Sequence, residues 1–174
     1  AIAESTKVER VVLQPRRDPS LPNPIVTARE DRCFQPFFAV LPCPGPGGYR
    51  IWYGACRDDR NPGRSLLATM ASADGVQFIR PHRICDTPEI QFGSKVLDRG
   101  QAYCDASARF VYSYWLGGGL RIMQSADGLR WQPLVDGVVI EHDHDINNID
   151  WDPLRGTFTA AISSDDGSRA ARSR

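Results

Sequence analysis

The sequence has no excess of charge of either sign and no long apolar run. Its 174 residues carry 21 Lys and Arg against 21 Asp and Glu, and the two signs are interspersed along the chain. Nucleic-acid binding needs a basic excess to neutralise phosphates, and an anionic membrane surface attracts a polybasic segment. No apolar run approaches the roughly 18 residues that a membrane-spanning helix needs. We predict a soluble globular protein without nucleic-acid or membrane partners.

The N-terminus lacks two further features. Its first residues, Ala1 to Ser5, contain neither an initiator Met nor the basic-then-apolar order of a signal peptide. We therefore expect a processed or trimmed chain. The localisation stays open between cytoplasm and export.

The cysteines show no metal-binding or redox spacing. The five residues are Cys33, Cys43, Cys56, Cys85 and Cys104. Because no Cys-x-x-Cys pair occurs, neither a zinc ribbon nor a redox pair is indicated, and we expect no metal and no other cofactor. Most of them lie in apolar runs typical of strands. This favours buried free thiols, with one disulfide as the alternative if the protein is exported.

What the sequence does contain is a repeat. The segments 72–78 and 125–131 both follow the pattern Ser-Ala-Asp-Gly-x-x-aromatic, and each comes after an apolar run. Asp-Gly between two apolar stretches is a strong hairpin signal, since Gly adopts positive φ and Asp bonds nearby backbone amides. The 13 Pro and 15 Gly residues argue against a helical bundle.

Further strands surround each turn, and together they define units of four strands. Aromatic and β-branched runs at 49–55 and 109–115 predict middle strands, and 34–41 and 101–104 predict strands before them. Each unit of about 50 residues has the size of a propeller blade. A third unit begins at 157–162, and Ser173 is expected to open its turn. The alternative is a small β-sandwich whose hairpins merely resemble one another.

The repeat predicts an all-β fold, a β-propeller with two and a half to three blades. We expect an N-terminal extension or closing strand at 1–24, blade one at 30–85, blade two at 94–141 and a partial blade three at 145–174. Because a closed propeller needs at least four blades, the remaining blades are expected from a longer chain or another protomer.

Innermost strands of a propeller converge on its axis, so their polar residues are candidates for a site. Asp98 and Gln101 align with Asp145 and Asn148, and the first unit has Asp31 and Gln35 near the same positions. The alignment predicts three carboxylates, one per blade, at one end of the axis. Cleavage of a glycosidic bond requires such groups as proton donor and as base or nucleophile.

Each candidate also has a simpler interpretation. Any one acid can be a turn cap or the partner of an arginine, and Arg32 and Arg99 are adjacent to two of them. The segment 142–145, His-Asp-His-Asp, invites a metal interpretation, but strand alternation would separate its histidines from its aspartates. We interpret it as a rim loop that contributes sugar contacts.

These residues resemble a known superfamily. The segments 49–55, 65–69 and 72–78 are similar to the first blade of five-bladed propeller proteins, the glycoside hydrolases of families 32, 43, 62 and 68. The segment 145–153, with Arg155 and Gly156 after it, resembles the inner strand and turn of a later blade in family-32-like members. The resemblance covers roughly residues 25 to 174.

The resemblance implies a glycosidase that cleaves or transfers a furanoside or related glycan, a role in carbohydrate metabolism. It implies Asp31 as base or nucleophile, Asp98 as the residue that holds the transition-state sugar, and Asp145 as the residue that tunes or supplies the proton donor. The residues expected to bind the carbohydrate substrate are Arg32, Gln35, Arg99, Gln101, His144 and Asn148. Two alternatives remain open: a non-catalytic propeller that binds glycan or protein, and a sialidase-like enzyme.

Overall fold

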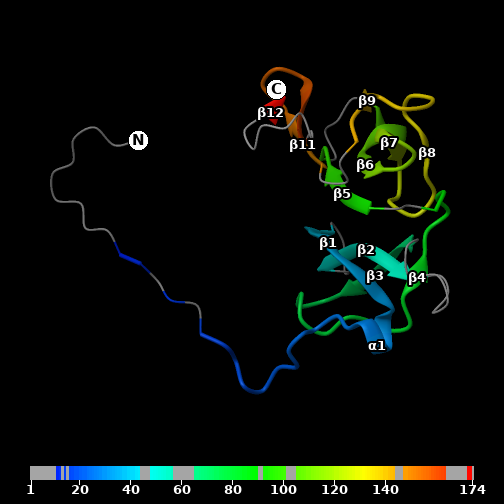
Figure 1. The fold of residues 1–174 in the computed structure, drawn as a ribbon. Coiled ribbons are helices and arrows are strands. Elements are labelled where there is room, and N and C mark those ends of the chain that lie inside the picture. Colours follow the sequence, from blue (N-terminus) through cyan, green and yellow to red (C-terminus); the bar gives the residue numbers. More distant parts are fainter. Residues whose placement is uncertain are drawn as a thin grey trace, which may run out of the picture.

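In the computed structural model, the regular structure is mostly antiparallel strands, in three consecutive sheets (Figure 1). The described residues are 11–12, 14, 16–43, 48–56, 65–89, 92–100, 105–143, 147–163 and 172–173. Within these ranges, only the backbone is described for 35–38, 92–94 and 172–173. The prediction of an all-β fold is confirmed. No helix in the described part of the chain has the length and apolar character needed to span a bilayer.

The first sheet follows one short helix. Its strands pair in chain order, each antiparallel to the next. The elements are α1 (Ala28–Asp31), β1 (Cys33–Pro42), β2 (Tyr49–Cys56), β3 (Ser65–Ser72) and β4 (Arg83–Ile84).

The second sheet repeats this order and adds a strand. Its elements are β5 (Phe92–Asp98), the 3-10 helix η1 (Ala106–Ala108), β6 (Phe110–Trp115), β7 (Gly119–Ser125), β8 (Gln132–Pro133) and β9 (Ile140–Glu141). β9 pairs with the opposite end of β7 from β8. The described strands of the third sheet are β10 (Asn147–Asp152), β11 (Thr157–Ser163) and β12 (Arg172–Ser173).

The two Asp-Gly segments form nearly identical turns. In the first, Ser72 Oγ accepts a hydrogen bond from the Gly75 amide, and Asp74 Oδ1 accepts bonds from the next two amides. The second turn repeats each bond with Ser125 and Asp127 as acceptors. Both glycines have positive φ, 77° at Gly75 and 71° at Gly128. The sequence prediction of these turns is confirmed.

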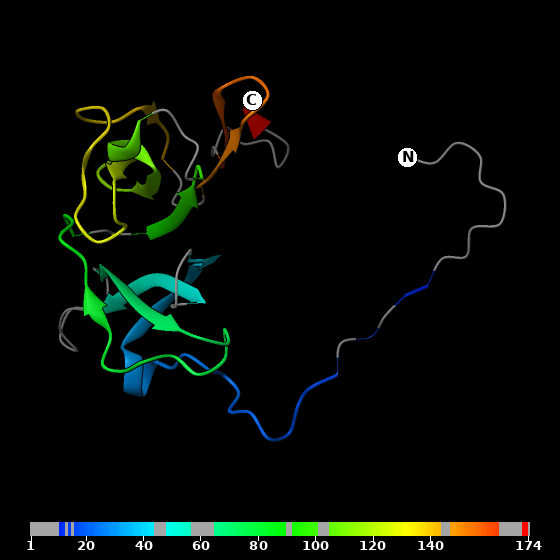
Figure 2. The same cartoon turned by 180° about the vertical axis from the view of Figure 1, so that it is seen from behind.

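Consecutive sheets pack against each other through apolar side chains. Trp52 and Leu67 of the first sheet and Tyr112 and Met123 of the second belong to one buried cluster. A second cluster joins the second and third sheets. Both views show β5 between the first sheet and the rest of the second (Figures 1 and 2). β5 is also the strand that contacts β1 on one side and β10 on the other.

The first strands of the three sheets run in the same direction. At one end, Arg109, beside the end of β5, lies near Cys43, which follows β1. At that same end, Arg99, which follows β5, lies over the ring of Trp151 near the end of β10, with 3.9 Å from Cζ to the ring centroid. At the other end, Trp115, paired with the first residue of β5, donates a hydrogen bond to the His142 carbonyl ahead of β10.

Two strand placements differ from the sequence prediction. The strand that opens the second sheet is β5 at 92–98, so Asp98 ends this strand and does not begin it. The sequence signal is weak there because Gly93, Ser94 and Lys95 interrupt the apolar pattern. In the third sheet Ser173 pairs with Ile162, near the end of β11, and not with a residue near its start.

Candidate functional site

Asp31, the first predicted catalytic residue, is completely buried in an ion pair. Its side chain is 0 % exposed, and Arg80 binds it through Nε and Nη2, at 2.8 Å and 2.9 Å. The Thr27 amide also donates to Asp31, and the hydroxyl of Tyr53 donates to the Asp31 carbonyl. A carboxylate held this way ties α1 to the segment after β3, and it offers no surface to a substrate.

Asp98 is in a similar pair at the end of β5. Arg109 binds it with two hydrogen bonds, 2.9 Å from Nε and 2.6 Å from Nη2, and the Gly100 amide donates a third of 2.8 Å. Burial acts to raise the pKa of Asp98, but these hydrogen bonds and the charge of Arg109 outweigh it and lower the pKa. Asp98 is therefore an ionised partner of Arg109, which is the opposite of a proton donor with a raised pKa.

The structure does not bring Asp31 and Asp98 together. Asp31 lies ahead of β1 and Asp98 lies at the end of β5, and these two strands run in the same direction. β1 alone has 10 residues, and a strand rises about 3.3 Å per residue, so the two carboxylates lie near opposite ends of these neighbouring first strands. Asp145, the third predicted catalytic residue, lies outside the described residues.

The residues predicted to bind sugar are divided between the two ends of the first strands of the sheets. Arg32 is exposed at the start of β1, with φ 55°, and Asn148 is exposed at the start of β10. Arg99 lies at the other end, where it stacks on Trp151 and on Phe158. Gln101 and His144 lie outside the described residues, as does the side chain of Gln35.

Three functional features were missed from the sequence. The arginine partners of the two aspartates, Arg80 and Arg109, are 49 and 11 residues away from them in the chain, and no local motif marks either pairing. Glu89, half-buried, comes shortly before β5, as Asp31 comes shortly before β1. An alignment of the sequence units that starts from the first residue of β5, and not from Asp98, would have identified Glu89.

The described residues contain no group of three His, Cys, Asp or Glu side chains placed to hold a metal ion. In the segment interpreted as a rim loop, His142 is buried and Asp143 is exposed, and its remaining two residues fall outside the description. Four cysteines, Cys33, Cys43, Cys56 and Cys85, are free thiols, and only the last is buried.

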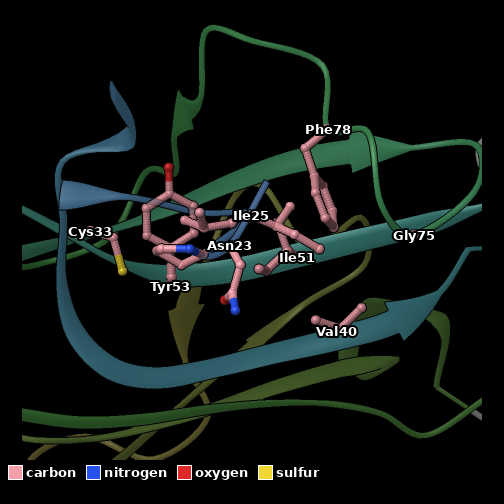
Figure 3. A pocket seen from close by; sticks show the side chains of 10 residues that line it. Asn23, Ile25, Cys33, Val40, Ile51, Tyr53, Gly75 and Phe78 are labelled. Carbon is pink, nitrogen blue, oxygen red and sulfur yellow. The ribbon is translucent and has the colours of Figure 1, made fainter. Parts of the chain in front are cut away.

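A cavity of about 470 Å³ lies on the face of the first sheet that points away from the second (Figure 3). Its walls are mainly apolar and come from three parts of the chain: the segment before α1, the strands β1 and β2, and the turn after β3. The side chains that Figure 3 shows around it include Ile25, Val40, Ile51, Tyr53 and Phe78.

No family model matches the chain, and comparisons with the curated proteins and with the solved structures found no match either.

Proposed function

We propose that the three sheets are consecutive blades of a β-propeller and that the protein binds glycan at the end of the inner strands that carries Arg32 and Asn148. Three features support the propeller: sheets of the same strand order follow one another, their first strands are neighbours, and those strands share one direction. The resemblance to five-bladed glycoside hydrolases agrees with this arrangement.

The observation that favours binding over cleavage is the state of the two described aspartates. Asp31 and Asp98 are each neutralised by an arginine, and they lie at opposite ends of the inner strands. Glycosidases need two carboxyl groups within about 5–10 Å of each other, across the bond that breaks. Asp31 and Asp98 do not supply that pair, whereas exposed polar side chains at the other positions still provide sugar contacts.

A glycan array with the protein tests this proposal. The glycan with the strongest signal is then titrated against the protein and two variants, Asn148→Ala and Thr159→Ala. Both positions are exposed on the third sheet, but Thr159 pairs with Asp150, farther along β10. We expect Asn148→Ala to weaken binding about fivefold, the effect of one net hydrogen bond, and Thr159→Ala to leave it unchanged. Absence of any bound glycan would refute the proposal.

A glycosidase remains the second candidate, because the structure suggests a different set of acids. Glu89 and Asp31 each come shortly before the first strand of a sheet, and in the sequence Asp145 comes two residues before β10. With Asp31 held by Arg80, the proposed acid and base are Glu89 and Asp145. Turnover of a glycoside that Glu89→Gln abolishes and Asp98→Asn preserves would favour this candidate.

A further inference from the structure

Among the contacts between the first and second sheets, one combines an indole and a guanidinium on the same turn. The indole of Trp52, on β2, packs against the turn after β7. Its Nε1 donates a hydrogen bond of 2.8 Å to the Gly128 carbonyl. Arg50, two residues earlier on the same strand, donates one of 3.0 Å to the Asp127 carbonyl. We call this contact the intersheet joint: an Arg-x-Trp strand on one sheet and an Asp-Gly turn on the next.

The joint has a close steric fit on the turn side. A Cβ atom added to Gly128 would lie 2.7 Å from the Trp52 ring, and Phe110 forms the floor beneath, with its ring centroid 5.8 Å from that of Trp52. The indole of Trp52 therefore fits against the turn because residue 128 has no side chain. Covered in this way, Phe110 is only 6 % exposed.

The first sheet has its own Asp-Gly turn and aromatic neighbour, which match the turn half of the intersheet joint. Gly75 corresponds to Gly128 in the repeat, and Tyr49 corresponds to Phe110, since each pairs with the serine that opens its turn. A Cβ on Gly75 would lie 3.3 Å from the Tyr49 ring, the same aromatic floor. Tyr49 is 39 % exposed, however, because no indole covers it.

The apolar cavity lies at this place. Gly75 lines it together with Ile51 and Phe78, which correspond in the repeat to Tyr112 and Trp131 of the second sheet (Figure 3). Among the described residues, no donor bonds to the Gly75 carbonyl or to the Asp74 carbonyl. These are the two acceptors that correspond to those used by Trp52 and Arg50 in the joint.

We propose that this cavity is the acceptor half of a second intersheet joint and binds an indole presented by an Arg-x-Trp strand of another sheet of the same repeat. The inference rests on the propeller arrangement proposed above but not on glycan binding. Its occupant is specified by chemistry: an indole N–H for the Gly75 carbonyl, and a guanidinium two residues earlier for the Asp74 carbonyl.

The charge at the rim agrees with a cationic partner. Asp74 is exposed, and hydrogen bonds from the amides of Gln77 and Val76, followed by that from Ser72, lower its pKa. Its ionised carboxylate lies beside the carbonyl that would accept the guanidinium bond, as the Asp127 carboxylate does beside the carbonyl bound by Arg50. An arginine is therefore favoured over a neutral donor there.

Titration of the ¹⁵N-labelled protein with peptides tests the inference by NMR. The probe is acetyl-Arg-Ile-Trp-Tyr-amide, the sequence of residues 50–53. The matched control peptide has 1-methyltryptophan in place of tryptophan, which replaces the indole N–H donor with an N-methyl group. We expect saturable shifts of the Gly75 and Val76 amide signals, with affinity about fivefold higher for the first peptide, the effect of one net hydrogen bond.

Two variants localise the binding. Val40 lines the cavity and is 43 % exposed, so Val40→Trp fills the cavity and should abolish the shifts. Val139→Trp, at a residue 40 % exposed but away from the cavity, should preserve them. The inference is overturned if neither peptide binds, if both bind equally, if Val40→Trp binds as wild type does, or if free indole binds as tightly as the peptide. None of these results depends on glycan binding, so the two proposals can fail separately.

Discussion

Arg80 and Asp31, 49 residues apart in the chain, form a two-bond ion pair that ties the segment after β3 to the short helix before β1. The carboxylate is 0 % exposed and the guanidinium side chain is 36 % exposed. A buried charge is tolerated only when it is paired and hydrogen-bonded. The pair therefore has a structural role, in keeping with the argument that Asp31 does not act on a substrate.

Removal of Arg80 should destabilise the protein strongly. In Arg80→Ala the buried Asp31 carboxylate loses its charge partner, which costs about 3 kcal/mol of unfolding free energy. The matched control is Arg155→Ala, which removes an arginine 79 % exposed from its pair with Asp152 and should cost about 0.5 kcal/mol or less. Urea unfolding measures both. Equal effects of the two substitutions would contradict the structural role of the Arg80–Asp31 pair.

The Asp98–Arg109 pair should make stability depend on pH. The pKa of Asp98 is lower in the folded protein than its ordinary value of about 3.9, so the unfolded chain binds its proton more readily. Its contribution to stability is therefore present above pH 5 and is lost as the pH falls through 4 towards the folded pKa. The free energy of unfolding of wild type minus that of Asp98→Asn should shrink between pH 6 and pH 3. A difference that stays constant across this range would show that the pair is absent in solution.

Two glycines with positive φ should respond differently to alanine. Gly128→Ala places a Cβ 2.7 Å from the Trp52 ring, whereas Gly137→Ala, at φ 82°, meets no atom within 4 Å. Both substitutions pay the left-handed backbone strain of about 1 kcal/mol, and only the first adds a steric cost of roughly 1–3 kcal/mol. Thermal and urea unfolding measure the difference. A Gly137→Ala variant as unstable as Gly128→Ala would contradict the fit of Trp52 against the turn.

Much of the fold could be predicted from the sequence because its signals are local. The turns after β3 and β7 follow from Ser-x-Asp-Gly, and β2 and β6 follow from dense aromatic and β-branched runs. β5 was placed incorrectly because Gly93 and Lys95 weaken its alternation. The candidate site was harder to predict, since the pairing of Asp31 with Arg80 depends on tertiary packing that no spacing encodes.

Cys85 should be the least reactive of the described thiols. Burial raises its pKa to about 12, and its side chain is 3 % exposed, whereas Cys43 is half-buried. Because the thiolate is the reactive form, iodoacetamide should modify Cys85 only when the chain unfolds. Mass spectrometry of peptides after timed alkylation, with and without urea, measures this. Rapid native alkylation of Cys85 would contradict its burial between the first two sheets.

We infer that Asp31 and Asp98 stabilise the fold through their arginine partners and do not cleave a substrate. The decisive measurement is the hydrolysis of a panel of aryl furanosides and pyranosides by wild type, Asp98→Asn and Glu89→Gln. We predict no turnover above the uncatalysed rate for wild type or for either variant. Turnover by wild type that Asp98→Asn abolishes, while circular dichroism shows the variant still folded, would contradict the claim.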